Sequence, residues 1–199
     1  MLKRILEALG ALLEDTPVFN RLIDQMKQWG DTQQAARAHL VSVLTNVVAS
    51  FERGHAIVLI ELSRLYAASS PQQYKQIAAS QIDRNKFYEL FKANDVCSHV
   101  HQLHADLKSG FGDIGDAIVL GAAKRLSRAL GDFEQGEYTL AEQYQEHLAK
   151  ALMSPADVDS VDDLRDALTE IAEEQARLSA ELAELTQFKR RLLQISLYG

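Results

Sequence analysis

The sequence has little of what builds disulfide-linked, β-rich or membrane-spanning proteins. A single cysteine, Cys97, excludes an intrachain disulfide and is consistent with a reducing compartment. Only three prolines and ten glycines occur among 199 residues, and no stretch alternates apolar and polar residues over a strand's length. No window approaches the roughly 20 apolar residues of a membrane span. The apolar start is cut by Glu7 without a signal-peptide cleavage site, so we expect a soluble, cytoplasmic, helical protein.

Cationic side chains are also in the minority, with 21 Lys and Arg against 28 Asp and Glu, and a formal net charge of −7. A protein that binds nucleic acid non-specifically usually presents a basic surface, so this balance argues against bulk DNA or RNA as a partner. Apolar residues make up 47% and charged residues 25%, which are values typical of globular proteins. A chain of this length can bury a sizeable core in one domain.

The most regular pattern lies between Ser160 and Leu197, where apolar residues recur in steps of three and four. They are Val161, Leu164, Leu168, Ile171, Leu178, Leu182, Leu185 and Leu192, while Gln175 and Lys189 occupy two positions where the pattern expects an apolar residue. This seam predicts a long, coiled-coil-like helix packed against other long helices, with Gln175 able to fix register or oligomeric state. The acidic first two-thirds and basic end of the segment favour an antiparallel partner.

Proline and glycine divide the rest of the chain. Ser70-Pro71 and Ser154-Pro155 are expected breaks, and the glycine-dense run 109–115 is an expected joint between helices. One helix is expected from residue 31 or 32 to about 68 and another from about 83 to 107. We predict an all-α, elongated bundle of about five to seven helices in a single domain. It would comprise an N-terminal helical hairpin over 1–30, a main bundle over 31–153 and a long C-terminal helix over 156–199.

Two short motifs resemble functional signatures but lack the required context. The spacing Gly110-x-Gly112-x-x-Gly115 matches a dinucleotide-binding loop, but it follows the end of a predicted helix where that motif requires a strand. Glu52-x-x-His55 has the spacing of carboxylate-bridged di-iron bundles, which need a second such pair, and the sequence contains none. We therefore interpret the glycines as a turn and give the Glu-His pair little weight.

Cys97, His101 and His104 form the densest set of candidate metal ligands. Their spacing of four and three residues places them on one face of a helix. Thiolate and imidazole ligands could hold zinc or another transition metal, although a tetrahedral site would need a fourth ligand from elsewhere. The competing interpretation is a boundary face on which the histidines are half exposed and Cys97 behaves as a small buried hydrophobe.

Apolar and basic residues crowd the end of the last helix, which predicts a docking surface onto the first helix of the same chain or onto another molecule. Its candidate residues, with the polar seam position, are Gln175, Phe188, Arg190, Arg191, Leu192, Ile195 and Tyr198. We expect a non-enzymatic interaction or scaffold protein without a cofactor, acting through a protein partner or self-association. The alternatives are a metal- or cofactor-binding bundle using the Cys97, His101 and His104 face, and a peripheral membrane protein.

Overall fold

The computed structural model is all-helical in the part of the chain that it describes. The described residues are 7–8, 10–11, 16–26, 33–80, 84–93, 95–131, 136, 141–142, 144–146 and 155–198. The helices are α2 (Thr16–Met26), α3 (Gln33–Tyr66), α4 (Pro71–Ala79), α5 (Arg84–Ala93), α6 (Val96–Ser109), α7 (Ala117–Gly131) and α9 (Val161–Tyr198), with short 3₁₀ turns η2 (Gly110–Gly112) and η4 (Pro155–Asp157). The predicted all-α fold and long C-terminal helix are confirmed.

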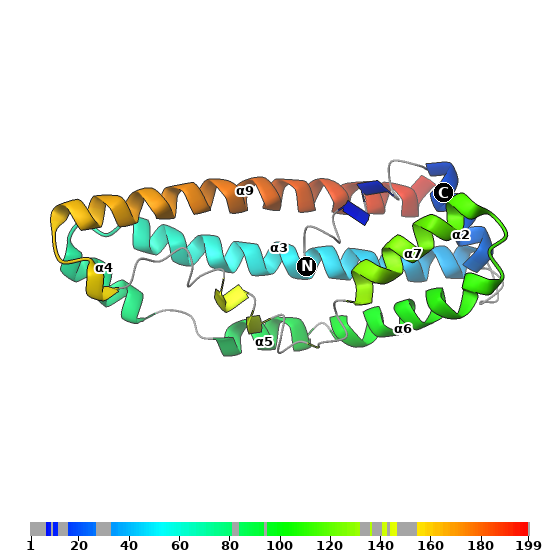
Figure 1. The fold of residues 1–199 in the computed structure, drawn as a ribbon, viewed down its shortest axis with the longest axis horizontal. Coiled ribbons are helices and arrows are strands. Elements are labelled where there is room, and N and C mark those ends of the chain that lie inside the picture. The colour runs from blue at the N-terminus through cyan, green and yellow to red at the C-terminus, as the bar shows by residue number, and fades with distance from the viewer. Residues whose placement is uncertain are drawn as a thin grey trace.

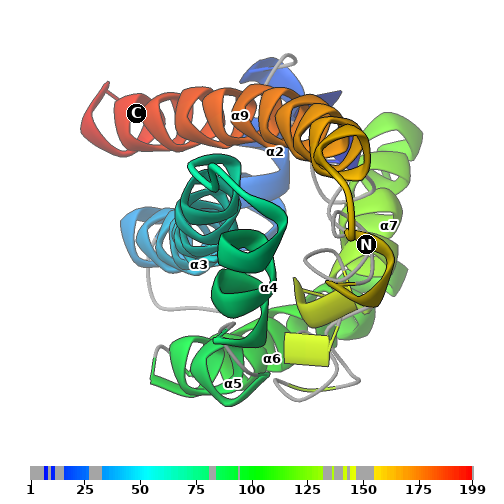
Figure 2. The same ribbon diagram turned by 90° about the vertical axis from the view of Figure 1, so that its left-hand side faces the viewer.

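Two long antiparallel helices, α3 and α9, form the axis of an elongated molecule (Figure 1). At one end the short helix α4 lies beside the end of α3, as the end-on view shows (Figure 2). At the other end α2, α6 and α7 pack around the first half of α3 (Figure 1). An ion pair between Arg21 of α2 and Asp116, just before α7, joins two of these helices. The antiparallel packing within the chain agrees with the direction that the charge pattern of α9 favours.

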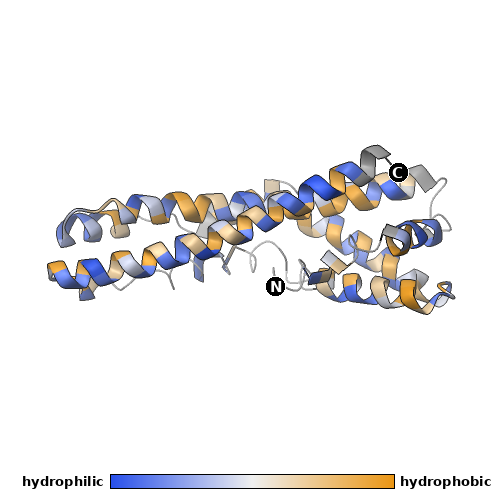
Figure 3. Cartoon of the chain, turned by 90° about the horizontal axis from the view of Figure 1, so that it is seen from above, coloured by the Kyte–Doolittle hydropathy of each residue, from blue (hydrophilic) through white to orange (hydrophobic). Residues whose placement is uncertain are grey.

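One continuous apolar core follows the axis and extends into the α2, α6 and α7 end. From α9 the buried seam side chains are Leu164, Ala167, Ile171, Leu178, Leu185, Phe188 and Leu192. Apolar and polar residues alternate around both long helices, which is the pattern expected of helices with one buried face (Figure 3). The predicted seam residue Val161 departs from this pattern because 67% of its surface is exposed.

The predicted helix from about 83 to 107 is wrong in one respect, because the chain breaks between α5 and α6. Asp95 adopts a left-handed conformation with φ 45°, and its N–H donates to Lys92 O at 3.0 Å. Buried Phe91 and Val96 flank the break. The apolar spacing therefore continues across it, and periodicity alone gives no sign of the turn.

The breaks predicted from proline and glycine agree with the structure wherever it is described. Ser70 caps α4, accepting the Gln73 N–H on Oγ at 3.2 Å, and Pro71 occupies the first turn. The glycine run 110–115 forms η2 and a turn between α6 and α7, as interpreted. Most of the predicted first helix and most of 132–154 lie outside the described residues.

Candidate functional site

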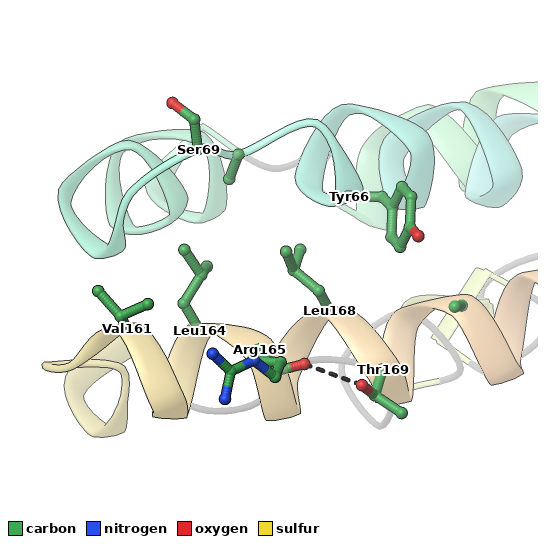
Figure 4. A pocket seen from close by; sticks show the side chains of 9 residues that line it. Tyr66, Ser69, Val161, Leu164, Arg165, Leu168 and Thr169 are labelled. Carbon is green, nitrogen blue, oxygen red and sulfur yellow. Dashed lines mark hydrogen bonds between the residues drawn. The ribbon is translucent and has the colours of Figure 1, made fainter.

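A groove of about 500 Å³ lies at the end of the bundle where α3 passes into α4 and α9 begins (Figure 4). Three parts of the fold supply its walls: the last turn of α3, the loop that follows it and the first three turns of α9. The lining residues are Tyr66, Ala68, Ser69, Val161, Leu164, Arg165, Leu168, Thr169 and Ala172. Most of these side chains are apolar, so the groove offers an apolar concave surface to solvent.

The groove has a buried floor and an exposed rim. Leu164 and Ala68 are only 6% and 5% exposed, whereas Val161 and Tyr66 are 67% and 50% exposed. Val161, Leu164 and Leu168 rise from α9 toward the end of α3 (Figure 4). Of the five large apolar side chains that are exposed in the described part of the chain, two therefore stand at this rim.

The groove exists because α9 extends past the end of α3. Gln175 Nε2 donates a hydrogen bond to Ser63 Oγ at 3.0 Å, which fixes the alignment of the two helices. The helices are antiparallel, so counting three residues forward from Ser63 on α3 corresponds to counting three residues back from Gln175 on α9. This places Tyr66 opposite Ala172. The first three turns of α9 thus have no α3 segment beside them, and the nine-residue α4 takes that place.

Acidic side chains lie along the solvent-facing side of α9 near the groove. The carboxylates of Asp162, Asp166, Glu170 and Glu173 are exposed and follow one another at spacings of four, four and three residues. Side chains at these spacings lie on one face of a helix, and this face is next to the one that lines the groove. Arg165, the cation of the lining, is held 2.8 Å from Asp162 by an i,i+3 ion pair. The first turns of α9 therefore carry an apolar lining and, on a neighbouring face, a row of carboxylates.

Two further polar groups fix this end of the molecule. Asp163 caps the start of α9 by accepting the Ser160 N–H at 2.8 Å and the Ser160 hydroxyl at 2.7 Å, and these bonds lower the pKa of Asp163. Ser160 Oγ in turn accepts the Asp163 N–H at 3.1 Å. Burial, and then the charge of Glu170, raises the pKa of Tyr74 on α4. The ion pair between Lys75 of α4 and Asp159 then holds the start of α9 beside α4.

The structure separates the three predicted metal ligands. Cys97 and His104 are buried, whereas His101 is exposed to solvent. The His104 ring packs against α7 at Gly131, where an added Cβ would lie 3.0 Å from His104 Cε1. Within the described ranges no three His, Cys, Asp or Glu side chains gather as metal ligands would. The alternative of a metal site on this face gains no support from these positions.

The residues predicted as a C-terminal docking surface mostly contact other parts of the same chain. Phe188 and Leu192 are buried, and an added Cβ at Gly10 would lie 3.4 Å from Phe188 Cζ, so Gly10 packs against Phe188. Gln175 bonds to Ser63, Arg191 is half-buried and Arg190 is exposed. The structure describes the backbone of Ile195 and Tyr198 but not their side chains. The part of this surface that the structure describes thus packs largely within the chain.

A buried polar cluster ties α3 to α9 near their middle. His55 is 3% exposed; its Nε2 lies 3.0 Å from Glu181 Oε2, and its Nδ1 lies 3.0 Å from both Phe51 O and the Tyr144 hydroxyl. The Tyr144 hydroxyl also donates to Phe51 O at 3.3 Å. Burial, reinforced by the charge of Glu181, raises the pKa of Tyr144 well above its ordinary value. Each of these polar atoms has a partner within the chain, so we assign the cluster a structural role.

Gly54 lets Tyr144 approach α3. A Cβ at this position would lie 2.5 Å from Tyr144 Cζ, which is closer than real Cβ atoms come to another heavy atom. Phe87 and Phe91 of α5 complete the packing, with ring centroids 5.5 and 5.6 Å from that of Tyr144. The mid-helix glycine thus marks a close approach of Tyr144 to α3.

The second polar seam position also finds its partner on α3. Lys189 Nζ forms an ion pair with Glu52 Oε2 at 2.6 Å, and Thr186 Oγ1 donates to Glu52 Oε1 at 2.9 Å. Glu52 and His55, the pair with di-iron spacing, therefore both face α9 but bond to different residues there. The polar interruptions of the seam are cross-links between the two long helices.

One helix meets the length and composition of a membrane span, contrary to the expectation that no window would approach one. It is Arg37–Tyr66 of α3, with a mean hydropathy of 1.3 in its most apolar window. Half of that window is buried inside the bundle. A buried core helix of a soluble protein meets the same criteria, so this property does not decide between a core helix and a membrane helix.

Comparisons with protein-family models, with curated proteins and with solved structures found no match to this chain. The seam pattern of the sequence predicts Val161, Leu164 and Leu168 but gives no indication of Tyr66 or Ser69. The sequence does contain a signal for the groove. Ser70-Pro71 must end the preceding helix, whereas the apolar seam of the last helix begins as early as Val161.

Proposed function

We propose that this protein is a non-enzymatic interaction or scaffold protein that acts through protein–protein contacts, with the groove as its docking surface. The supporting observation is that Tyr66 and Val161 stand exposed at the rim of a concave apolar floor. Sites that receive a partner's side chain are typically concave and apolar with polar groups at the edge. Exposed aromatic residues such as Tyr66 often contribute much of the binding energy at such sites.

The scaffold around the groove suits this role. Both walls belong to long helices, and the alignment of those helices is fixed by Ser63–Gln175, His55–Glu181 and Glu52–Lys189 contacts. A surface held in its binding shape loses little conformational freedom when a partner docks. The groove also lies at the far end of the molecule from α2 and α7 (Figure 1).

Site-specific photo-crosslinking in cells tests this proposal. A photo-crosslinking amino acid replaces Tyr66 in the full chain, and a matched chain carries it at Ile118, which is 60% exposed on α7 at the other end. We expect discrete crosslinked products from position 66 that do not form from position 118. Identical products from both positions, or none from position 66, would contradict the groove as a docking surface.

A partner identified in this way should also bind through the rim side chains. The double variant Tyr66→Ser/Val161→Ser removes both exposed anchors, and we expect it to weaken the partner's affinity by about tenfold or more. Ile118→Ser removes an equally exposed apolar side chain elsewhere and should leave the affinity unchanged. Because all three side chains are largely exposed, circular dichroism and melting should show little change in the fold.

A further inference from the structure

We propose that the occupant of the groove is a cationic amphipathic helix, with apolar side chains along one face and Lys or Arg along its flank. This inference rests on the proposed docking function and adds the chemistry of the partner. It is carried by the apolar floor of the groove together with the net negative charge of the segments that form this end, which includes the exposed carboxylates of Asp162, Asp166 and Glu173 on the solvent-facing side of α9.

The net charge of the protein is concentrated at this end. The segments 61–80 and 155–173, which form it, contain three Lys and Arg and eight Asp and Glu, a net charge of −5. The remaining 160 residues account for only −2 of the total of −7. A concentrated negative charge attracts cationic partners, speeds their association and disfavours acidic ones.

The cations at this end are already paired within the chain. Each has one acidic partner: Arg64 with Glu61 at 2.8 Å, Lys75 with Asp159 at 2.5 Å and Arg165 with Asp162 at 2.8 Å. Among the described residues Asp166, Glu170 and Glu173 form no ion pair, and all three are exposed. These three carboxylates remain available to the cations of a docked segment.

The dimensions of the groove fit a helix of about three turns. The lining runs from Val161 to Ala172 along α9, which is about 16 Å at 1.5 Å per residue. An amphipathic helix laid along this path presents apolar residues at i, i+3 or i+4, and i+7 to Val161, Leu164 and Leu168. Cations on its flank then lie on the side of α9 that carries the exposed carboxylates of Asp166 and Glu173.

A second copy of the chain fits the groove less well. A symmetric tip-to-tip contact would bring two segments of net charge −5 against each other, and like charges across an interface are unfavourable. The charge of the groove thus favours a heterologous, basic segment over self-association through this end.

Designed peptides test the inference with the full-length protein. Three 18-residue amphipathic peptides carry leucine at the same positions and either lysine, glutamine or glutamate at all others, and binding is followed by fluorescence anisotropy. We expect the Leu/Lys peptide to bind, the Leu/Gln peptide to bind at least tenfold more weakly and the Leu/Glu peptide not to bind. Raising the salt from 50 to 300 mM should weaken the Leu/Lys complex severalfold, because surface charges are screened.

Matched variants show whether the carboxylates at this end are responsible. Asp166→Lys/Glu173→Lys should weaken binding of the Leu/Lys peptide by about tenfold or more. Asp113→Lys/Glu184→Lys changes the net charge equally at two exposed acids outside the groove and should have little effect. Equal losses in the two double variants would mean that only the overall charge attracts the peptide, which would overturn the inference.

The remaining outcomes separate this inference from the docking function. If the Leu/Gln peptide binds as tightly as Leu/Lys and is lost with Tyr66→Ser/Val161→Ser, the groove docks a helix but the cationic partner is wrong. If neither peptide's binding changes with Tyr66→Ser/Val161→Ser, the groove is not the site and both proposals fail. Sedimentation of the protein alone that reveals a dimer lost in that variant would assign the groove to a second copy.

Discussion

Gln175 of α9 donates a hydrogen bond to Ser63 of α3, three residues before α3 ends. With the His55–Glu181 and Glu52–Lys189 contacts, this pair marks where the long helices lie relative to each other and therefore how far α9 extends beyond its partner. The groove at Tyr66 and Val161 lies at that extension.

The Gln175–Ser63 bond should be measurable as a coupling energy. Gln175→Ala and Ser63→Ala should each destabilise the protein by about 0.5–1 kcal/mol, the usual value for one neutral hydrogen bond. If the two side chains bond to each other, the double variant should lose less than the sum, by about 0.5 kcal/mol. Urea unfolding of the wild type, the two single variants and the double variant measures the four free energies of unfolding that this comparison needs. Strictly additive losses would mean that the two residues do not interact.

Gly54 should tolerate no side chain. Gly54→Ala places a Cβ 2.5 Å from Tyr144 Cζ, and we expect overpacking to cost about 1–3 kcal/mol despite the better helix propensity of alanine. Gly121 of α7 is the control, because the nearest atom to an added Cβ there is Arg125 Nη1 at 3.8 Å. Gly121→Ala should stabilise the protein by up to about 1 kcal/mol. Thermal unfolding of the two variants should therefore move in opposite directions.

Tyr144 should make the fold sensitive to alkali. Burial raises the pKa of the folded Tyr144 above its ordinary value of 10.0, so only the unfolded chain ionises this group just above pH 10. The stability that depends on neutral Tyr144 is complete below pH 10 and is lost as the pH rises above it. Tyr144→Phe should cost about 1–2 kcal/mol at pH 7, through the lost bonds to His55 and Phe51 O, but should lack this alkaline component.

Urea unfolding at several pH values between 8 and 11 measures the effect. The wild-type curve should fall more steeply above pH 10 than the curve of Tyr144→Phe. Parallel curves would show that Tyr144 ionises as readily in the folded protein as in the unfolded chain, and would contradict its burial beside Glu181.

Asp163 should contribute to stability in the opposite pH range. Its hydrogen bonds from Ser160 lower the folded pKa below the ordinary value of 3.8. The contribution of the ionised carboxylate is therefore present above about pH 3.8 and is lost as the pH falls through the lowered folded pKa. Asp163→Asn should flatten the acid side of the melting-temperature profile between pH 2 and 5. An acid limb identical to that of the wild type would contradict the capping role.

Much of the fold could be predicted from local sequence signals. Helix boundaries are predicted by Ser70-Pro71 and by the glycines at 110–115, because the backbone preferences of these residues are incompatible with continuing a helix. The seam positions of α9 identify its buried face, and the polar exceptions Gln175 and Lys189 proved to be the sites of cross-links to α3. These features depend on neighbours within a few residues, or on one helix face, and are therefore visible in the sequence.

The break at Asp95 and the groove were not visible in the same way. Asp95 takes a left-handed conformation while Phe91 and Val96 keep a helical spacing across it, so the apolar pattern hides the turn. The groove depends on the relative alignment of Tyr66 and Val161, which are 95 positions apart in the chain. That alignment is set by tertiary packing, and the same apolar seam would predict burial of Val161 wherever a partner helix covered it.

Hydrogen–deuterium exchange with the Leu/Lys peptide reports where the peptide docks on the protein. We expect slower amide exchange in 64–70 and 160–173 when the peptide is bound, with no change in α7. Slower exchange confined to 117–131 or to the end of α9, with 64–70 and 160–173 unaffected, would contradict the groove as the docking surface.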